Sequence, residues 1–188
     1  FDTVQDVGKA PQYRLDRERN GGGSLFDLGI YPLNTTRYLL QEEPVEVSAM
    51  QWSDPKDPRF KEIEQNIAFQ LRFPSGCIAS CTSSFGTQRV NRYKVMCADG
   101  WLGMDPATSY RGLKASHGDD TGTHEMKLEE INQFAAEVDH FARCIREDKE
   151  PDTPGPEGLR DVNLMLAIYR AARERRAIKV GDDGAAVD

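Results

Sequence analysis

The stretch GGGSLFDLGIYPLNTTRY, residues 21–38, joins three glycines and a serine to a segment with helical periodicity. We predict a helix from Ser24 to Leu40, in which Asp27 and Tyr31 lie one turn apart. Residues four apart on a helix share a face, so this carboxylate and this phenol converge on one side. A phenol beside a carboxylate can transfer a proton. Asp27 and Tyr31 are therefore the candidate catalytic residues.

Each of these two residues also has a purely structural interpretation. Ser24 and Asp27 have the spacing of a capping box, in which the carboxylate satisfies a backbone N–H group at the helix start. Tyr31 can equally be a half-buried core tyrosine whose hydroxyl finds a partner. From the residues alone both interpretations stay open, and capping does not exclude catalysis for Asp27. Pro32 interrupts the helix and predicts a kink directly beside Tyr31.

Composition bounds the class of protein. The chain has 188 residues, 38% hydrophobic and 29% charged, which fits a globular domain with its own core. A net charge of −7 disfavours nucleic acid and anionic membranes as partners, and no apolar run approaches a membrane span. The four cysteines lack metal-ligand spacing and the three histidines are scattered, so we expect free thiols and no metal site. Free thiols indicate a reducing compartment, which favours the cytoplasm over the periplasm.

Beyond the first helix the apolar residues alternate with period two, which is typical of strands. The predicted strands are 45–49, 67–73, 77–85, 92–97, 101–104, 110–115 and 124–128, with helices around 131–145 and 159–172. Short connections indicate antiparallel pairing. We therefore predict an α+β fold: an open-faced, mainly antiparallel β-sheet of about six strands with helices packed on one face. Residues 1–20 are an approach segment, 21–180 the domain, and 181–188 a tail predicted to be disordered.

The strings GGGS, GIY, LN-x-TRYLL and EEP-x-EV extend the opening pattern over residues 21–47. Together they resemble the C-terminal domain of the glucose–fructose oxidoreductase / inositol dehydrogenase (Gfo/Idh/MocA) family, which opens on GGG, a few apolar residues and D-x-G-x-(H/Y). The likeness is closest to the glucose–fructose oxidoreductase branch, since inositol dehydrogenases place histidine at the position of Tyr31. Family members carry a Rossmann-type domain before this region, and this chain has no G-x-G-x-x-G between a strand and a helix. We therefore expect a C-terminal fragment that is inactive alone.

The resemblance implies reversible hydride transfer between a sugar or polyol and NADP or NAD, with the cofactor bound mainly by the missing N-terminal domain. Tyr31 matches the position proposed to transfer the proton, and Asp27 would orient the substrate hydroxyl and a lysine of the absent domain. A free tyrosine has a pKa of about 10, so proton acceptance at neutral pH requires a nearby cation. The residues implied to contact substrate or cofactor are Tyr13, Arg14, Asn34 and Tyr110.

The resemblance also implies partners, and two other function classes stay open. The expected partners are the protein's own Rossmann domain and a second copy, in a homodimer or tetramer formed through the open sheet face. One alternative is a non-catalytic module for sugar binding or assembly. The other is a hydrolase that uses Asp27 with a second carboxylate, Glu125 or Asp105.

Overall fold

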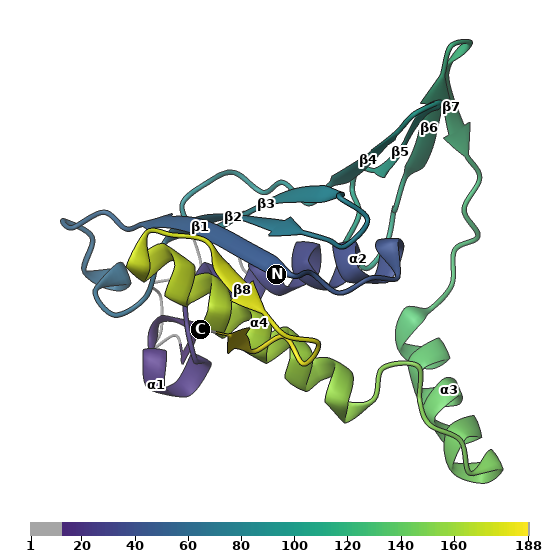
Figure 1. The fold of residues 1–188 in the computed structure, drawn as a ribbon. Helices are drawn as coiled ribbons and strands as arrows, with labels where there is room; N and C mark the ends of the chain where they lie inside the picture. The colour runs from purple at the N-terminus through teal and green to yellow at the C-terminus, as the bar shows by residue number, and fades with distance from the viewer. Residues whose placement is uncertain (1–12, 188) are drawn as a thin grey trace. The chain divides into compact units, whose positions relative to one another are not determined.

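The computed structural model describes residues 13–187, which fold into two compact units (Figure 1). The first unit contains the residues up to Gln88 and those from Gly155 onward, and the second contains Arg89–Pro154. Each unit has its own antiparallel sheet, so the predicted α+β class is confirmed. The strands that we expected in one sheet of about six are divided between a five-stranded and a four-stranded sheet.

The five-stranded sheet of the first unit has the order β3-β2-β1-β8-β9. Its strands are β1 (Glu46–Trp52), β2 (Asn66–Arg72), β3 (Ile78–Ser84), β8 (Ile178–Val180) and β9 (Ala186–Val187). Its helical elements are η1 (Tyr13–Leu15), α1 (Arg17–Asn20), η2 (Leu25–Gly29), α2 (Ile30–Leu40), η3 (Pro58–Phe60) and α4 (Gly155–Glu174). The helix predicted around 159–172 is thus confirmed as α4.

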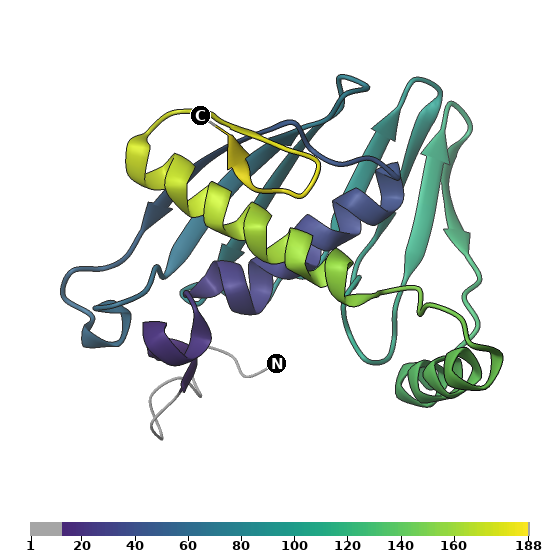
Figure 2. The same cartoon turned by 60° about the horizontal axis from the view of Figure 1, so that its bottom comes forward.

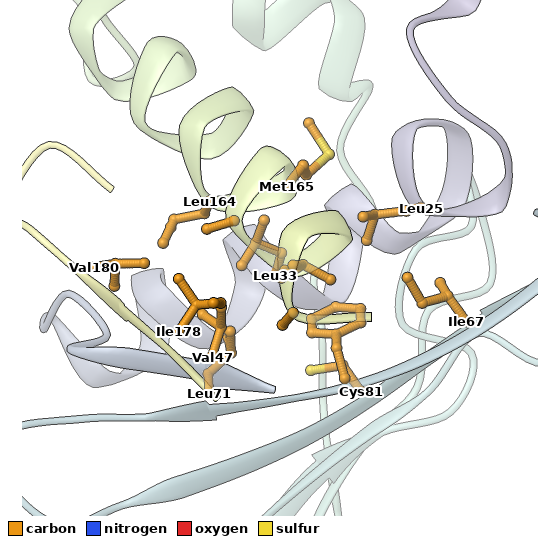
Figure 3. Packing of buried hydrophobic residues seen from close by; sticks show 14 of the residues in the cluster. Leu25, Leu33, Val47, Ile67, Leu71, Cys81, Leu164, Met165, Ile178 and Val180 are labelled. Atoms are coloured by element: carbon orange, nitrogen blue, oxygen red, sulfur yellow. The ribbon is translucent and has the colours of Figure 1, made fainter. Parts of the chain in front are cut away.

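Helices α2 and α4 cover the same face of this sheet (Figures 1 and 2). α4 packs on β1 and β8, while α2 and η2 pack on β3. Because side chains alternate along a strand, Val47, Phe69 and Leu71 are buried on the helix-facing side. They meet Leu33 of α2 and Leu164 of α4 in one apolar core, which Figure 3 shows from close by. Among residues 13–187, no helix of this unit covers the opposite side of the sheet (Figures 1 and 2).

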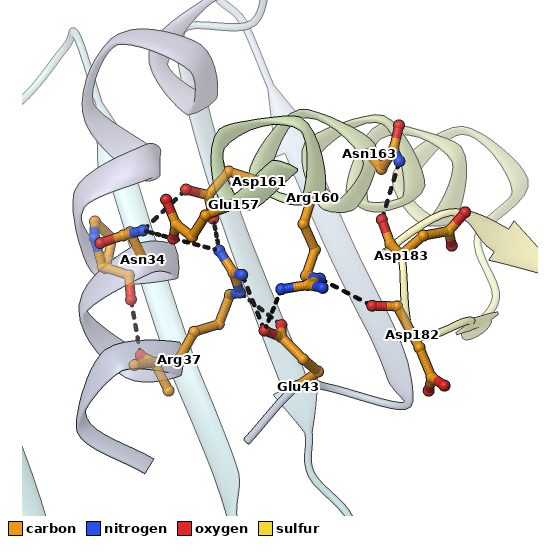
Figure 4. A network of polar contacts seen from close by, with 11 residues as sticks. Asn34, Arg37, Glu43, Glu157, Arg160, Asp161, Asn163, Asp182 and Asp183 are labelled. Carbon is orange, nitrogen blue, oxygen red and sulfur yellow. Dashed lines mark hydrogen bonds and ion pairs between the residues drawn. The ribbon is translucent and has the colours of Figure 1, made fainter. Parts of the chain in front are cut away.

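A buried arginine on α2 holds α2 to α4 and to the loop before β1 (Figure 4). Arg37 is 5% exposed, and its Nε and Nη2 donate to the carboxylate of Glu43 at 2.7 and 3.0 Å. Its Nη1 donates to Glu157 at 3.2 Å and to Asp161. Burial opposes the charge of Arg37, but Glu43 and Asp161 outweigh it and hold the pKa of the guanidinium above its ordinary value. The group therefore stays charged inside the protein.

The C-terminal residues form a hairpin, and the prediction of a disordered tail is wrong for residues 181–187. The strand β9 pairs with β8, and Gly184 takes a positive φ of 77° in the turn between them. The Gly181 N–H donates to the carbonyl of Ala185 at 2.9 Å, and Arg160 of α4 donates to the carbonyl of Asp182 at 2.9 Å. Hydrogen bonds to backbone groups hold this segment, and its small, acidic composition does not reveal them.

The second unit contains a four-stranded antiparallel sheet in the order β4-β5-β6-β7, followed by a helix. Its elements are β4 (Tyr93–Cys97), β5 (Gly100–Met104), β6 (Ala115–Asp119), β7 (Gly122–Met126) and α3 (Gln133–Glu147). The predicted strand 110–115 is wrong, because residues 105–114 form a loop that the Asp105 N–H and the Lys114 carbonyl close at 3.0 Å. The helix predicted around 131–145 is confirmed.

All four cysteines are free, as predicted. Cys81 and Cys144 are buried, and Cys97 is exposed. Burial raises the pKa of the Cys81 thiol to about 11, so this group behaves as a small core residue rather than a nucleophile. Within residues 13–187, no helix is both long enough and apolar enough to cross a membrane.

Replacing Arg37 with methionine should lower the free energy of unfolding by about 3–5 kcal/mol, because the buried carboxylate of Asp161 loses its cation. The matched control is Arg72→Met, which removes an exposed ion pair with Glu46 at 2.9 Å and should change stability by at most about 1 kcal/mol. Urea unfolding measures both. Equal losses for the two variants would contradict the structural role assigned to Arg37.

Candidate active site

Asp27 lies on a widened helical turn, and Tyr31 follows at the start of α2. The turn η2, Leu25–Gly29, has π-helical geometry, and the Ile30 N–H donates to the Leu25 carbonyl. Pro32 lacks an N–H and would press against the Leu28 carbonyl in a regular helix. Residues 30–40, Pro32 included, form α-helix after this wide turn, and the kink that we predicted at Pro32 itself stays a prediction. Such π-turns inside helices occur frequently at functional sites.

Contacts in the structure join three of the predicted site residues, Tyr13, Arg14 and Asp27, at this turn. The Arg14 Nε donates to the Asp27 carboxylate at 3.0 Å, in an ion pair whose side chains are 23% and 18% exposed. The Arg14 guanidinium also lies over the ring of Tyr13, 5.0 Å from its centre. Tyr31 is half-buried one turn beyond Asp27. The structure thus pairs a cation of η1 with a carboxylate of η2, both partly open to solvent, and Tyr31 follows at the start of α2.

Two other predicted contact residues lie elsewhere. The Asn34 amide donates to Glu157 at 2.7 Å and to Asp161 at 2.9 Å, within the network that joins α2 to α4. Tyr110 belongs to the second unit, where its ring lies 5.2 Å from that of Phe134. Contact of either residue with substrate or cofactor stays a prediction.

The start of η2 is held by a carboxylate from another loop rather than by a capping box. Ser24 makes no side-chain cap, and its hydroxyl donates to the Ser83 carbonyl at 3.4 Å. Instead, the carboxylate of Glu64 accepts the N–H of Gly23 at 3.0 Å and the N–H of Leu25 at 2.8 Å. Asp27 has Arg14 as its partner, so the capping-box interpretation is wrong.

Tyr169 of α4 completes this arrangement. Its hydroxyl donates to Glu64, with both carboxylate oxygens at 2.9 Å, and accepts the Gly23 N–H at 3.1 Å. Its ring stacks on Phe26 at 5.9 Å. Burial, and then the charge of Glu64, raises the pKa of Tyr169 above its ordinary value. The phenol therefore keeps its proton and acts as the donor to Glu64.

The glycines are required by this close packing. A Cβ at Gly22 would lie 2.2 Å from the Tyr169 hydroxyl oxygen, and one at Gly23 would lie 2.2 Å from the Glu64 carbonyl oxygen. Farther along, a Cβ at Gly29 would meet Ser83 of β3 at 3.0 Å, so this glycine lets the helical segment approach the sheet. The opening string of the motif therefore reflects packing as well as chemistry.

No group of three or more metal-ligating side chains occurs in the part of the chain that the structure describes. A glycine-rich turn at a helix start often binds a phosphate. Here the Gly23 and Leu25 N–H groups already point to the Glu64 carboxylate. The glycine run therefore does not fit a cofactor phosphate.

Sequence reasoning missed Glu64 and Tyr169. Glu64 lies in the irregular stretch before β2, and nothing around it distinguishes it from an exposed glutamate such as Glu62. Tyr169 falls on the apolar stripe of α4, where a tyrosine is ordinary core material. The available signal was the glycine run itself, since adjacent glycines predict a close approach of other groups.

Comparison with known proteins shows similarity over most of the chain. Residues 1–103 match the family model of the GFO/IDH/MocA C-terminal domain. The D-xylose 1-dehydrogenase (NADP(+)) of Haloarcula marismortui is 35% identical over 173 residues, which are 90% of this chain and 47% of that protein. A 1,5-anhydro-D-fructose reductase of Ensifer adhaerens is 24% identical over 170 residues, 89% of this chain and 50% of that protein.

Among solved structures, an aldose-aldose oxidoreductase from Caulobacter crescentus, complexed with glycerol, is 46% identical with a TM-score of 0.88. The match covers 92% of this chain and 52% of that one. The chain therefore spans about half the length of the relatives that it matches.

Substituting alanine for glycine should have opposite effects at two positions. Gly23→Ala should lower the free energy of unfolding by about 1–3 kcal/mol, because its methyl group overlaps the Glu64 backbone. Gly158→Ala, on the exposed side of α4 with nothing within 4 Å of its Cβ, should raise stability by up to about 1 kcal/mol. Thermal or urea unfolding compares the two. A neutral Gly23→Ala would contradict the close contact.

Proposed function

Because the chain belongs to the GFO/IDH/MocA family through that family's C-terminal domain, we propose that it is the substrate-binding half of an NAD(P)-dependent oxidoreductase. The reaction is hydride transfer to or from a sugar or polyol. The relatives named above act on, or are named for, aldoses and related sugars, which supports this substrate class. The observation that carries the proposal is the Arg14–Asp27 ion pair, one turn from Tyr31 on the widened helical turn.

The three side chains have distinct roles in this proposal. When the sugar is oxidised, its carbon gives up a hydride, which the nicotinamide accepts when it is bound. The hydroxyl on the same carbon loses its proton to the phenolate of Tyr31, and in the reverse direction the Tyr31 phenol returns that proton. Asp27 accepts a hydrogen bond from a neighbouring sugar hydroxyl and orients it. Arg14 holds the Asp27 carboxylate in one position through the 3.0 Å contact.

The cofactor belongs mainly to another part of the protein in this proposal. The Gly23 and Leu25 N–H groups are taken by Glu64, so they offer no site for the cofactor phosphates. A Rossmann-type domain, expected from the family resemblance, would bind NADP or NAD and supply the lysine whose charge lowers the pKa of the phenol.

The exposed side of the five-stranded sheet is the proposed surface for association with a second copy. Thr82 and Ser80 of β3 lie on this side, and so does Met50 of β1, which is 79% exposed and faces Thr82 across Ala68 of β2. Trp52, on the same side, is 57% exposed. Small polar residues beside large exposed apolar ones form a flat surface that a second sheet can cover.

Tyr31→Phe, made in the full-length enzyme, should slow hydride transfer by about 10²–10⁴-fold, because general acid–base catalysis is typically worth that factor. Nucleotide affinity should stay close to wild type, and Tyr31→His should recover part of the loss, since an imidazole can also transfer the proton. Single-turnover absorbance of the nicotinamide between pH 6 and 9 measures the rate.

The control for this substitution is Tyr38→Phe, which removes the same oxygen from an exposed tyrosine on the same helix. It should leave the rate unchanged. A Tyr31→Phe enzyme as fast as Tyr38→Phe would make Tyr31 a core residue only. Sugar binding without any turnover, in the wild-type enzyme supplied with nucleotide, would favour the non-catalytic module instead.

Thr82→Arg should weaken self-association, because it places a charge within the proposed sheet-to-sheet contact. Size-exclusion chromatography with light scattering should give a dimer or tetramer for the wild type and a smaller particle for the variant. Thr87→Arg, at an exposed position outside the strands, is the control and should keep the wild-type mass. A wild type that is monomeric at all practical concentrations would refute the association.

A further inference from the structure

Three successive backbone N–H groups at the start of the functional turn converge on one residue, Glu64. The Gly23 N–H points to Oε2 at 3.0 Å, and the Leu25 N–H points to Oε1 at 2.8 Å. Between them, the Ser24 N–H contacts the backbone carbonyl of Glu64 at 3.3 Å. This is the geometry by which helix starts bind anions, with a carboxylate of the same chain as the anion.

The carboxylate of Glu64 is buried, and defined partners surround it. Glu64 is 6% exposed, and the Tyr169 hydroxyl donates to it from α4. Gly22 and Gly23 have no side chains that would prevent either approach. A buried carboxylate is stable only when hydrogen bonds and partial charges replace its hydration. Two backbone N–H groups, one phenol and the positive end of the helical segment provide that replacement here.

We propose that Glu64 is a positioning residue for Asp27: its buried carboxylate sets the place and direction of the turn that carries the reacting side chains. The effect on catalysis rests on the function proposed above. Glu64 touches neither substrate nor cofactor in this assignment, and it acts through the backbone.

A short series of hydrogen bonds to backbone groups of the turn connects the Glu64 carboxylate to Asp27. Glu64 holds Gly23 and Leu25, and the Asp27 N–H in turn contacts the Gly23 carbonyl at 3.3 Å. The η2 turn is wide and has poorer hydrogen bonding than an α-helix, so its own backbone does not define its position strongly. An external anchor at its first residues therefore determines where the Asp27 carboxylate meets Arg14.

The test compares Glu64→Gln with Glu62→Gln in the full-length protein that contains this chain. The two substitutions are chemically identical, and Glu62 is an exposed residue two positions away. In Glu64→Gln the side chain keeps its shape, but its NH₂ group faces a backbone N–H, so one N–H of Gly23 or Leu25 loses its acceptor. Glu62→Gln should behave as the wild type in every measurement.

Hydrogen exchange and the rate of hydride transfer are the two main measurements. Hydrogen exchange of the peptide spanning residues 22–31 should quicken by about tenfold or more in Glu64→Gln, because the amide of Gly23 or that of Leu25 is no longer held. Single-turnover hydride transfer should slow by about 10- to 100-fold, since small misplacements of reacting groups carry penalties of that order. The dissociation constant of the nucleotide should stay within about twofold of wild type. A purely structural role would lower the unfolding temperature without changing the rate of the folded enzyme.

Tyr169→Phe provides a second variant that is milder than Glu64→Gln. It removes only the phenol oxygen that donates to Glu64, so it should raise exchange at Gly23 and slow hydride transfer less than Glu64→Gln does. If Glu64→Gln does not fold, the comparison of Tyr169→Phe with the wild type tests the positioning role.

The outcomes separate the two proposals. Exchange and turnover in Glu64→Gln or Tyr169→Phe that match Glu62→Gln would overturn the positioning role, whatever the reaction. A wild-type protein that lacks hydride transfer with every sugar and nucleotide would contradict the proposed function. The exchange measurement would still decide whether Glu64 holds the turn.

Discussion

A helix start leaves backbone N–H groups that need acceptors, and the way this chain supplies them governs the rest of the site. The acceptors come from Glu64, which lies in the loop between η3 and β2 and far along the chain from the turn that it holds. For its carboxylate to reach Gly23, no side chain can intervene, and this explains the adjacent glycines. For the carboxylate to be buried, a further donor is needed, and Tyr169 provides it from α4. One electrostatic requirement thus accounts for residues in three separate parts of the sequence.

The other end of the same helical segment is anchored by opposite charge. Arg37 ties α2 to Glu43, Glu157 and Asp161, while the η2 turn before α2 is tied to Glu64. Asp27 and Tyr31 lie between a buried anion and a buried cation, each with its own set of partners. Side chains on a segment that is fixed at both ends keep their positions without the help of a ligand, which is the arrangement that catalysis by orientation requires.

Sequence reasoning predicted those features that depend on local pattern. The strands around residues 45–49, 67–73 and 77–85 and the helices near 131–145 and 159–172 follow from apolar periodicity, and the structure has them. Asp27 and Tyr31 are candidates because of their spacing and the family resemblance, and their role stays a prediction. No local sequence pattern predicts the role of Glu64, the Arg37 network or the hairpin of β8 and β9, because all three depend on contacts between distant residues. The division into two sheets was likewise invisible, because alternation predicts strands but not which strands pair.

The position of the second unit within the sequence has a consequence for how the protein is made. Arg89–Pro154 is inserted between β3 and α4, so the core partners Leu71 and Leu164 are separated by the whole of that unit. During synthesis η2 and α2 precede β1, β2 and β3, but the part of the apolar face that α4 covers stays open until α4 has followed. The inserted unit, whose strands pair with their neighbours in sequence, can close in the meantime. The apolar surface that α4 covers is therefore open while residues 85–154 are synthesised, and the core is completed only after the inserted unit.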